Sequence, residues 1–159
     1  MKVTTGDLIE LARQGNFNVI VHGCNCFHVM GGGIARQLKD IYPNVFEVDK
    51  TSPRGDRSKL GSYTSVYVRD RFTVVNAYTQ FHFGEDPQAK DGVLADYDAI
   101  RKAFASIKKE FGGQGVRFGI PKIGAGLARG DWDVISAIIG EEMAGEDVTL
   151  VLWNNGRLG

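Results

Sequence analysis

The side chains best suited to catalysis or ligand binding lie together at the junction of a predicted strand and a predicted helix. The stretch "VIVHGCNCFHVMGGGIARQL", residues 19–38, holds two histidines, two cysteines, one asparagine and three consecutive glycines. Such a set can bind a metal ion, form a redox pair, supply a thiol nucleophile or, through its glycines, cradle a phosphate group. The spacing of the residues distinguishes these readings.

The two cysteines, Cys24 and Cys26, are separated by a single residue. On an extended chain they point to opposite faces, so a disulfide between them would be strained. Structural zinc sites usually space paired ligands by about two to four residues, and the remaining histidine, His82, is distant in the sequence. We therefore predict no metal site and two small buried thiols; a nucleophilic thiol would need a base and a low pKa that the sequence cannot show.

His22 and Asn25 each allow two interpretations. A histidine that ends a buried strand beside a phosphate-type loop can donate to an anion or exchange protons near neutral pH. The alternative for His22 is a core histidine bonded to backbone. Asn25 can bind sugar hydroxyls through its amide, or it can stabilise the turn in which it lies.

Periodicity and turn residues predict an alternation of strands and helices around these positions. We predict the order β-α-β-α-β-β-α-β-α-β, in which residues 62–68 and 72–80 form a hairpin and residues 94–111 form the clearest helix. Strands alternating with helices indicate a mostly parallel sheet covered on both faces, which the hairpin makes mixed. The fold class is therefore α/β with about six strands.

Two predicted strands are followed by a glycine-rich loop and then by a helix. The second instance is "RFGIPKIGAGLARGDWDVISAII", residues 117–139. Glycines let a ligand approach the main chain, and the following helix directs free N–H groups and the positive end of its dipole at that ligand. Two such loops favour an anionic nucleotide that carries a diphosphate. Neither loop matches the P-loop or dinucleotide fingerprints, which disfavours NTP hydrolysis and dinucleotide redox chemistry.

The composition sets wider bounds on structure and function. A chain of 159 residues is large enough to bury its own core, so we predict one domain over residues 1–159. The chain has 19 Lys+Arg and 19 Asp+Glu residues, so it has no net positive charge that would attract nucleic acid or an anionic membrane surface. We see no secretory signal and no apolar run of membrane-spanning length, and the two cysteines form no disulfide framework. We therefore expect a cytoplasmic protein with no membrane association.

Three motifs together resemble the macro domain family, which binds ADP-ribose. They are "GDL" near the N-terminus, "VIVHGCNC...GGGIARQL" and "IPKIGAGLARGDW", and the resemblance extends over essentially the whole chain. It implies a three-layer α/β/α macro-type domain. The second motif resembles the branch of ADP-ribose 1″-phosphate phosphatases of the fungal and phage kind.

The resemblance also implies roles for matching positions. Asp7 would accept from the adenine amino group, Asn25 would contact the distal ribose, and Trp153 would pack against the base unless it closes the core. Asp7 can equally sit in the first helical turn and favour the helix dipole. The complete set of expected ligand-binding residues is Asp7, Leu8, Asn25, Gly31, Gly32, Gly33, Ile34, Ile123, Gly124, Ala125, Gly126, Leu127, Trp153 and Asn154.

The leading activity implied is hydrolysis of ADP-ribose 1″-phosphate to ADP-ribose and phosphate, with no cofactor. His22 matches a histidine implicated in turnover in the phosphatase branch, and Asp131 or His28 would be its catalytic partner. Macro hydrolases that use a Lys–Asp pair have their lysine where this chain has Thr79 and Gln80.

The aspartate of these Lys–Asp hydrolases falls at Ala128 of this chain, so the Lys–Asp mechanism is disfavoured. The chain also lacks the aromatic residue that many macro domains place near Ala128. The alternatives are removal of ADP-ribose from an ADP-ribosylated protein or nucleic acid, and a binding module without turnover.

Overall fold

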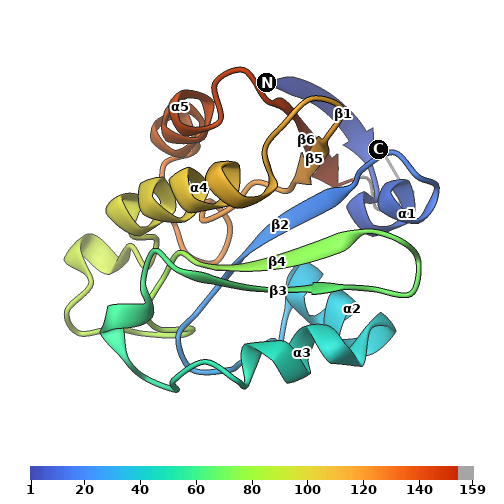
Figure 1. The fold of residues 1–159 in the computed structure, drawn as a ribbon. Coiled ribbons are helices and arrows are strands. Elements are labelled where there is room, and N and C mark those ends of the chain that lie inside the picture. Colours follow the sequence, from blue (N-terminus) through green and yellow to red (C-terminus); the bar gives the residue numbers. More distant parts are fainter. Residues whose placement is uncertain (154–159) are drawn as a thin grey trace, which may run out of the picture.

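The protein is described by a computed structural model in which residues 1–153 are placed. Six strands form one mixed sheet in the order β1-β6-β5-β2-β4-β3 (Figure 1). The strands are Lys2–Gly6 (β1), Val19–Cys24 (β2), Tyr63–Tyr67 (β3), Thr73–Tyr78 (β4), Arg117–Ile120 (β5) and Asp147–Trp153 (β6). All neighbouring strands are parallel except β3, which runs antiparallel to β4. The α/β class and the mixed sheet are thereby confirmed.

Helices cover both faces of this sheet and complete three layers. The α-helices are Leu8–Arg13 (α1), Gly33–Ile41 (α2), Pro43–Asp49 (α3), Tyr97–Phe111 (α4) and Trp132–Glu142 (α5); short 3-10 turns span Arg57–Lys59 (η1) and Lys90–Gly92 (η2). Helices α4 and α5 cover one face, and α1, α2 and α3 cover the other (Figure 1). No helix in residues 1–153 is long and apolar enough to cross a bilayer.

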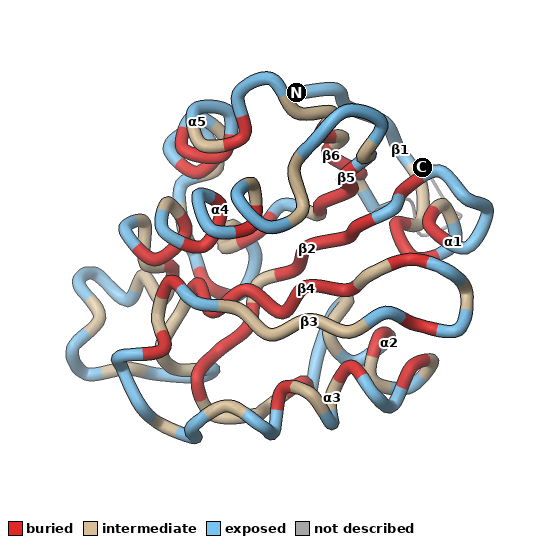
Figure 2. The backbone as a smooth tube through the Cα atoms, in the orientation of Figure 1, coloured by how far each residue is buried: buried red, intermediate tan, exposed pale blue. Residues whose placement is uncertain are grey.

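Alternation along the central strands sends side chains into two separate cores. On β2, Val19 and Val21 join the core beneath α4 and α5, whereas Ile20 and Cys24 join the core beneath α1, α2 and α3. Because both faces of β2 and β4 are covered, these strands read as continuous apolar runs in the sequence. Figure 2 shows the buried residues concentrated on the sheet and on the inner sides of the helices.

Helix boundaries follow from capping residues. The Asp7 carboxylate accepts hydrogen bonds from the N–H groups of Ile9 and Glu10, so α1 begins at Leu8, and Gly6 belongs to the preceding strand. Pro43 stands at the first position of α3, where its missing N–H costs nothing, and α2 ends before it at Ile41. The carboxylates of Asp96 and Asp131 cap α4 and α5 in the same way.

The contact between β5 and α1 predicts the consequence of a small substitution. A Cβ added at Gly119 would lie 2.6 Å from a ring carbon of Phe17 and 2.8 Å from Leu8, both buried. Gly119→Ala should therefore lower the free energy of unfolding by about 1–3 kcal/mol, as overpacking does. Gly140, inside α5, has nothing within 4 Å of its added Cβ. Gly140→Ala is the control and should raise stability by about 0.5–1 kcal/mol. Urea denaturation measures both, and equal effects of the two changes would contradict this packing.

Candidate functional site

A cleft opens where β2, β4 and β5 end at one edge of the sheet. Its volume is about 550 Å³, and both glycine-rich loops line it. The lining residues are Gly23, Cys24, Asn25, Val29, Gly31, Gly32, Gly33, Ile34, Ala35, Gln80, Phe83, Gly124, Gly126, Leu127 and Ala128. The fold thus brings together two segments that are about 100 residues apart in the sequence.

The first wall of the cleft is the N-terminus of α2. Gly32 is the N-cap and offers no side-chain acceptor, and Gly33 takes a left-handed φ of 57°. The N–H groups of the first helical turn have no intrahelical partner, and here Gly33, Ile34 and Ala35 line the cleft. This end of α2 therefore presents uncapped donors and the positive end of the helix dipole.

Asn25 shapes the turn that leads to this helix. Its side-chain oxygen accepts from the N–H groups of Phe27 (2.9 Å) and Val29 (3.4 Å), and its amide nitrogen donates to the Val29 carbonyl at 2.8 Å. Only 8% of Asn25 is exposed. Asn25 lies in the cleft, and its hydrogen bonds show that it stabilises the turn, whereas its contact with a sugar stays a prediction.

The second wall is the connection between β5 and α5. The Gly130 N–H donates to the Gly124 carbonyl at 2.7 Å, and the Ala128 carbonyl accepts from Leu94 at 2.8 Å, so the loop is anchored at both ends. Between these anchors the N–H groups of Gly124, Gly126 and Leu127 have no hydrogen-bond partner within residues 1–153. They are donors available to a ligand in the cleft.

No lysine, arginine, histidine, aspartate or glutamate side chain is among the described residues that line the cleft. Negative charge on a ligand would therefore be met by main-chain N–H groups and the α2 dipole. This is a setting suited to a diphosphate, and it lacks a titratable group other than the Cys24 thiol.

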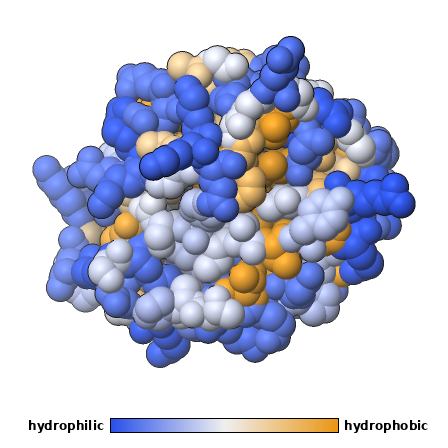
Figure 3. All heavy atoms as spheres, in the orientation of Figure 1, coloured by the Kyte–Doolittle hydropathy of each residue, from blue (hydrophilic) through white to orange (hydrophobic). Residues whose placement is uncertain are grey.

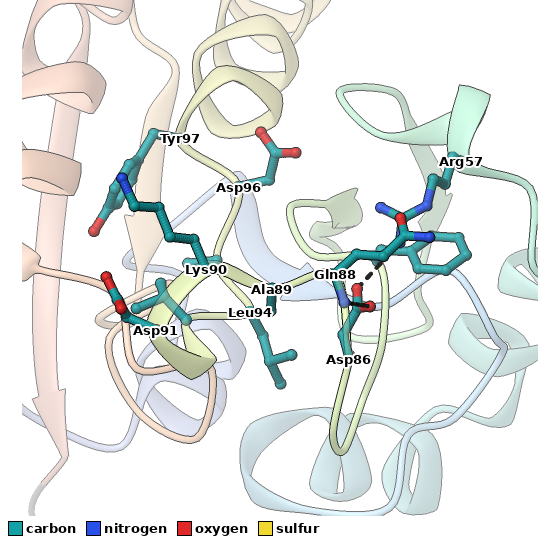
Figure 4. Close-up of a pocket in the computed structure, with 12 residues that line it drawn as sticks. Arg57, Asp86, Gln88, Ala89, Lys90, Asp91, Leu94, Asp96 and Tyr97 are labelled. Carbon is teal, nitrogen blue, oxygen red and sulfur yellow. Dashed lines mark hydrogen bonds and ion pairs between the residues drawn. The ribbon is translucent and has the colours of Figure 1, made fainter.

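A second hollow of about 500 Å³ lies along the β4–α4 connection (Figure 4). It is lined by side chains of both charges, and Arg57 and Asp86 face one another across 3.2 Å as an ion pair. Lys90, Asp91 and Asp96 project from the other side of this hollow. None of the expected ligand-binding residues lines it, so we assign the functional site to the cleft.

The structure places His22 outside the cleft lining, so its position does not support the catalytic role that the sequence predicted. Its side chain points into the core beneath α2 and α3, only 1% of the residue is exposed, and it does not line the cleft. Nε2 of His22 lies 2.6 Å from the side-chain oxygen of Asn76 on β4, the residue paired with His22 in the sheet. Burial lowers the pKa of His22, so the ring is neutral at pH 7 and reaches the cleft only through its 3.6 Å contact with the Cys24 sulfur.

Neither proposed partner of His22 lies in the cleft. His28, with a left-handed φ of 60°, places Nε2 2.7 Å from the carbonyl of Ser52. Asp131 caps α5, and its carboxylate accepts from the Asp133 N–H at 2.9 Å. The positions of His28 and Asp131 therefore do not support the catalytic roles predicted for them either: both side chains stabilise local structure away from the lining.

The cysteines behave as the spacing predicts. Both are free thiols with little exposure. Burial raises the pKa of Cys24 well above its ordinary value and raises the pKa of Cys26 to about 11, so both remain protonated at neutral pH. Within residues 1–153 no three histidine, cysteine, aspartate or glutamate side chains come together as metal ligands would.

The residues expected at the adenine end lie at the edge of the sheet, outside the cleft lining. Gly6 pairs with Trp153 across β1 and β6, so Asp7 and Trp153 come from adjacent strand ends, and Trp153 is 59% exposed and does not close the core. Leu8 is buried in the core and can offer only its backbone. Ile123 is also buried, and Ala125 packs against the core rather than lining the cleft. Asn154 lies outside the described residues.

The sequence did not predict three of the side chains that line the cleft. Gln80 and Phe83 come from the β4–α4 connection, and Val29 comes from the β2–α2 connection. These connections have no periodicity from which orientation can be read. The one sequence signal that could have indicated a binding residue here was an aromatic residue, Phe83, at the start of a polar loop.

A buried polar network supports the first loop from below. Lys59 donates from Nζ to the Ser52 hydroxyl at 2.6 Å and lies 4.2 Å from the centre of the Tyr78 ring. The Tyr78 hydroxyl donates to Asp49 at 2.7 Å. Burial lowers the pKa of Lys59. Burial is also the largest of the causes that raise the pKa of Tyr78. Because the Ser52 carbonyl contacts His28, the network ties the first loop to α3, η1 and β4.

The chain is similar to a phage protein in sequence and to several solved structures in fold. The chain is 35% identical over 161 residues to an uncharacterised 17.5 kDa protein from the tk–vs intergenic region of Enterobacteria phage T4, and the match covers 96% of each chain. Among solved structures it resembles the macrodomain of Thermus aquaticus DarG, with a TM-score of 0.70, 19% identity and coverage of 96% of this chain and 97% of that one. It also resembles a Trypanosoma brucei macrodomain solved in complex with ADP-ribose, with a TM-score of 0.66, 17% identity and coverage of 97% of this chain and 64% of that one. No family model matches the chain.

The sheet order, the two covering layers and the paired glycine loops thus define a macrodomain fold. The chain belongs to the same family as the phage T4 protein, with which it shares nearly its full length.

The burial of His22 predicts a pH dependence of stability. The pKa of His22 is lowered in the folded protein, whereas in the unfolded chain it has the ordinary histidine value of about 6.5. Below that pH the unfolded chain therefore binds more protons than the folded protein does. Stability from this group is therefore complete above that pH and is lost as the pH falls, by at most about 1.4 kcal/mol per pH unit. Denaturation between pH 7.5 and 5.5 should show this slope, and His22→Gln should flatten it. An unchanged slope in the variant would contradict a neutral, buried His22.

Proposed function

We propose that the protein binds ADP-ribose in the cleft, with the diphosphate held between the two glycine-rich loops. The observation that carries this proposal is the convergence of unpartnered main-chain donors from α2 and from the β5–α5 connection on one cleft without charged side chains. Such donors suit a diphosphate because they meet its charge without the cost of burying a cationic side chain.

The arrangement of the sheet edge supports the rest of the ligand's placement. Asp7 and Trp153 lie at adjacent strand ends and would receive the adenine, and Asn25 would face the distal ribose. One oxygen of the Asp7 carboxylate accepts the capping bonds of α1, so adenine would be read by the other oxygen. The complex of the T. brucei macrodomain with ADP-ribose shows that this fold accommodates such a ligand.

The reaction we propose is hydrolysis of ADP-ribose 1″-phosphate in the cytoplasm. Its support is the resemblance of the first loop to that phosphatase branch, and not the position of His22. Binding of ADP-ribosylated macromolecules is the competing proposal for the same cleft.

Two glycine substitutions test the binding site. An added Cβ at Gly32 or at Gly126 meets nothing within 4 Å, and both residues line the cleft, so glutamate should be tolerated by the fold and should project charge toward the diphosphate. Gly32→Glu and Gly126→Glu should each weaken ADP-ribose binding by about 100-fold or more, because like charges in contact cost several kcal/mol. Isothermal titration calorimetry measures this, and Gly140→Glu, on the exposed side of α5, is the control that should bind normally. Full affinity in both cleft variants would overturn the proposed site.

Phosphate release separates the proposed reactions. Purified protein should release phosphate from ADP-ribose 1″-phosphate, and Gly126→Glu should abolish that release. His22→Gln should retain activity within about tenfold, whereas loss of a general acid or base costs about 10²–10⁴-fold. Release of ADP-ribose from modified protein or DNA, without phosphate release, would favour the competing proposal. Tight ADP-ribose binding with neither product would indicate a binding module.

A further inference from the structure

Strand β1 forms one edge of the sheet and is exposed along most of its length. It pairs with β6 in one parallel register over all its residues, and within residues 1–153 no strand pairs with its other side. Residues 2–5 are all exposed, as Figure 2 shows. Every second residue of a parallel edge strand directs its N–H and C=O away from the neighbouring strand, so β1 presents a row of backbone donors and acceptors to another chain.

The features that usually protect an edge strand are weak in β1. Such strands avoid pairing with other chains through charged side chains, proline, a bulge or a covering segment. The sequence KVTTG contains three β-branched residues and no proline, and its register with β6 has no bulge. Its one charged residue, Lys2, is drawn back to the sheet, because Nζ lies 2.9 Å from the Asp147 carboxylate on β6. The other edge is better protected, since residues 63–66 of β3 are half-buried and α3 packs against this strand.

The charges on β1 are self-complementary in an antiparallel pair of two copies. With Thr4 opposite Thr4 of a second copy, the five residues of both strands pair, and Lys2 of each copy faces Gly6 of the other. No like charges then face each other, and each Lys2 lies beside the Asp7 that follows Gly6 in the other copy. The 19 basic and 19 acidic residues of the chain also leave no net charge to keep two copies apart.

This pairing would partly cover two exposed apolar side chains. Val3 is 62% exposed and Met1 is 49% exposed. Val3 is in register with Leu150, which belongs to the core beneath α4 and α5, and Met1 lines a small hollow with Ile139 and Met143 of the same core. Hydrophilic residues predominate on the face seen in Figure 3, and apolar residues form only small areas there. Backbone pairing along β1, rather than a large apolar patch, would therefore drive association.

We propose that β1 is a self-association surface, on which two copies of the chain pair their β1 strands antiparallel and centred on Thr4. The pairing joins two six-stranded sheets into one and leaves the cleft open, since β1 contributes none of the cleft lining. Two short strands bury little area compared with the roughly 1,200–2,000 Å² of a stable interface, so the dimer is weak and forms at high protein concentration. This inference does not depend on the ligand that the cleft binds.

Opposite charges introduced at Thr4 test the pairing and its register. Sedimentation velocity of the wild-type protein from about 10 μM to about 1 mM, a range suited to weak association, should show a concentration-dependent dimer. Thr4→Lys and Thr4→Glu each place like charges opposite one another, and each should weaken dimerisation by about tenfold or more. An equimolar mixture of the two variants should dimerise at least as well as the wild type, because opposite charges then face each other. Tyr67→Lys places a charge at the exposed end of β3 and is the control that should dimerise normally.

Three results would overturn the proposal. The first is a wild-type protein that stays monomeric over the whole concentration range. The second is a dimer that both Thr4 variants retain, because such a dimer would use another surface. The third is loss of the dimer in both variants without recovery in their mixture, which would contradict a pairing centred on Thr4. Far-ultraviolet circular dichroism of each variant verifies that the fold is intact.

Discussion

The site depends on the parallel pairing of β2 with β5. Residues Val19 and Ile20 pair with Phe118 and Gly119, so the two strands end at the same edge and deliver their loops side by side. Neither loop alone encloses a ligand, because each contributes a short row of main-chain donors. Once the strands are paired, the donors of both loops border one cleft, and the affinity for an anion that we propose for it would follow from backbone geometry rather than from charged side chains.

That reliance on backbone explains why polar side chains near the cleft serve structure. The amide of Asn25 closes a turn, Asp131 caps a helix, and His28 contacts the Ser52 carbonyl. The network of Lys59, Tyr78 and Asp49 beneath the loop holds buried polar groups that would be costly if unpaired, and it is satisfied by its own members. A rigid support of this kind preserves donor positions, which is what binding by main-chain N–H groups requires.

The sequence predicted the elements well because their signals are local. The apolar run before Cys24, the glycines before Ile34 and the amphipathic pattern that ends at Phe111 each specify one element without reference to the others. The strand order could not be predicted, since it depends on pairings such as β2 with β5 that join distant segments. His22 shows a second limit: alternation places it on the face of Ile20 and Cys24, but which face borders a cleft is decided by the loops. Phe83 shows a third, because its connection has no periodicity to orient a side chain.

The most direct test of the account is an amide chemical-shift titration of ¹⁵N-labelled protein with ADP-ribose. If the diphosphate lies between the loops, the amide signals of Gly33 and Ile34 on one side and of Gly124, Gly126 and Leu127 on the other should shift together along a single binding curve. Shifts confined to one loop, or shifts that cluster instead around the hollow between Arg57 and Tyr97, would contradict the shared cleft.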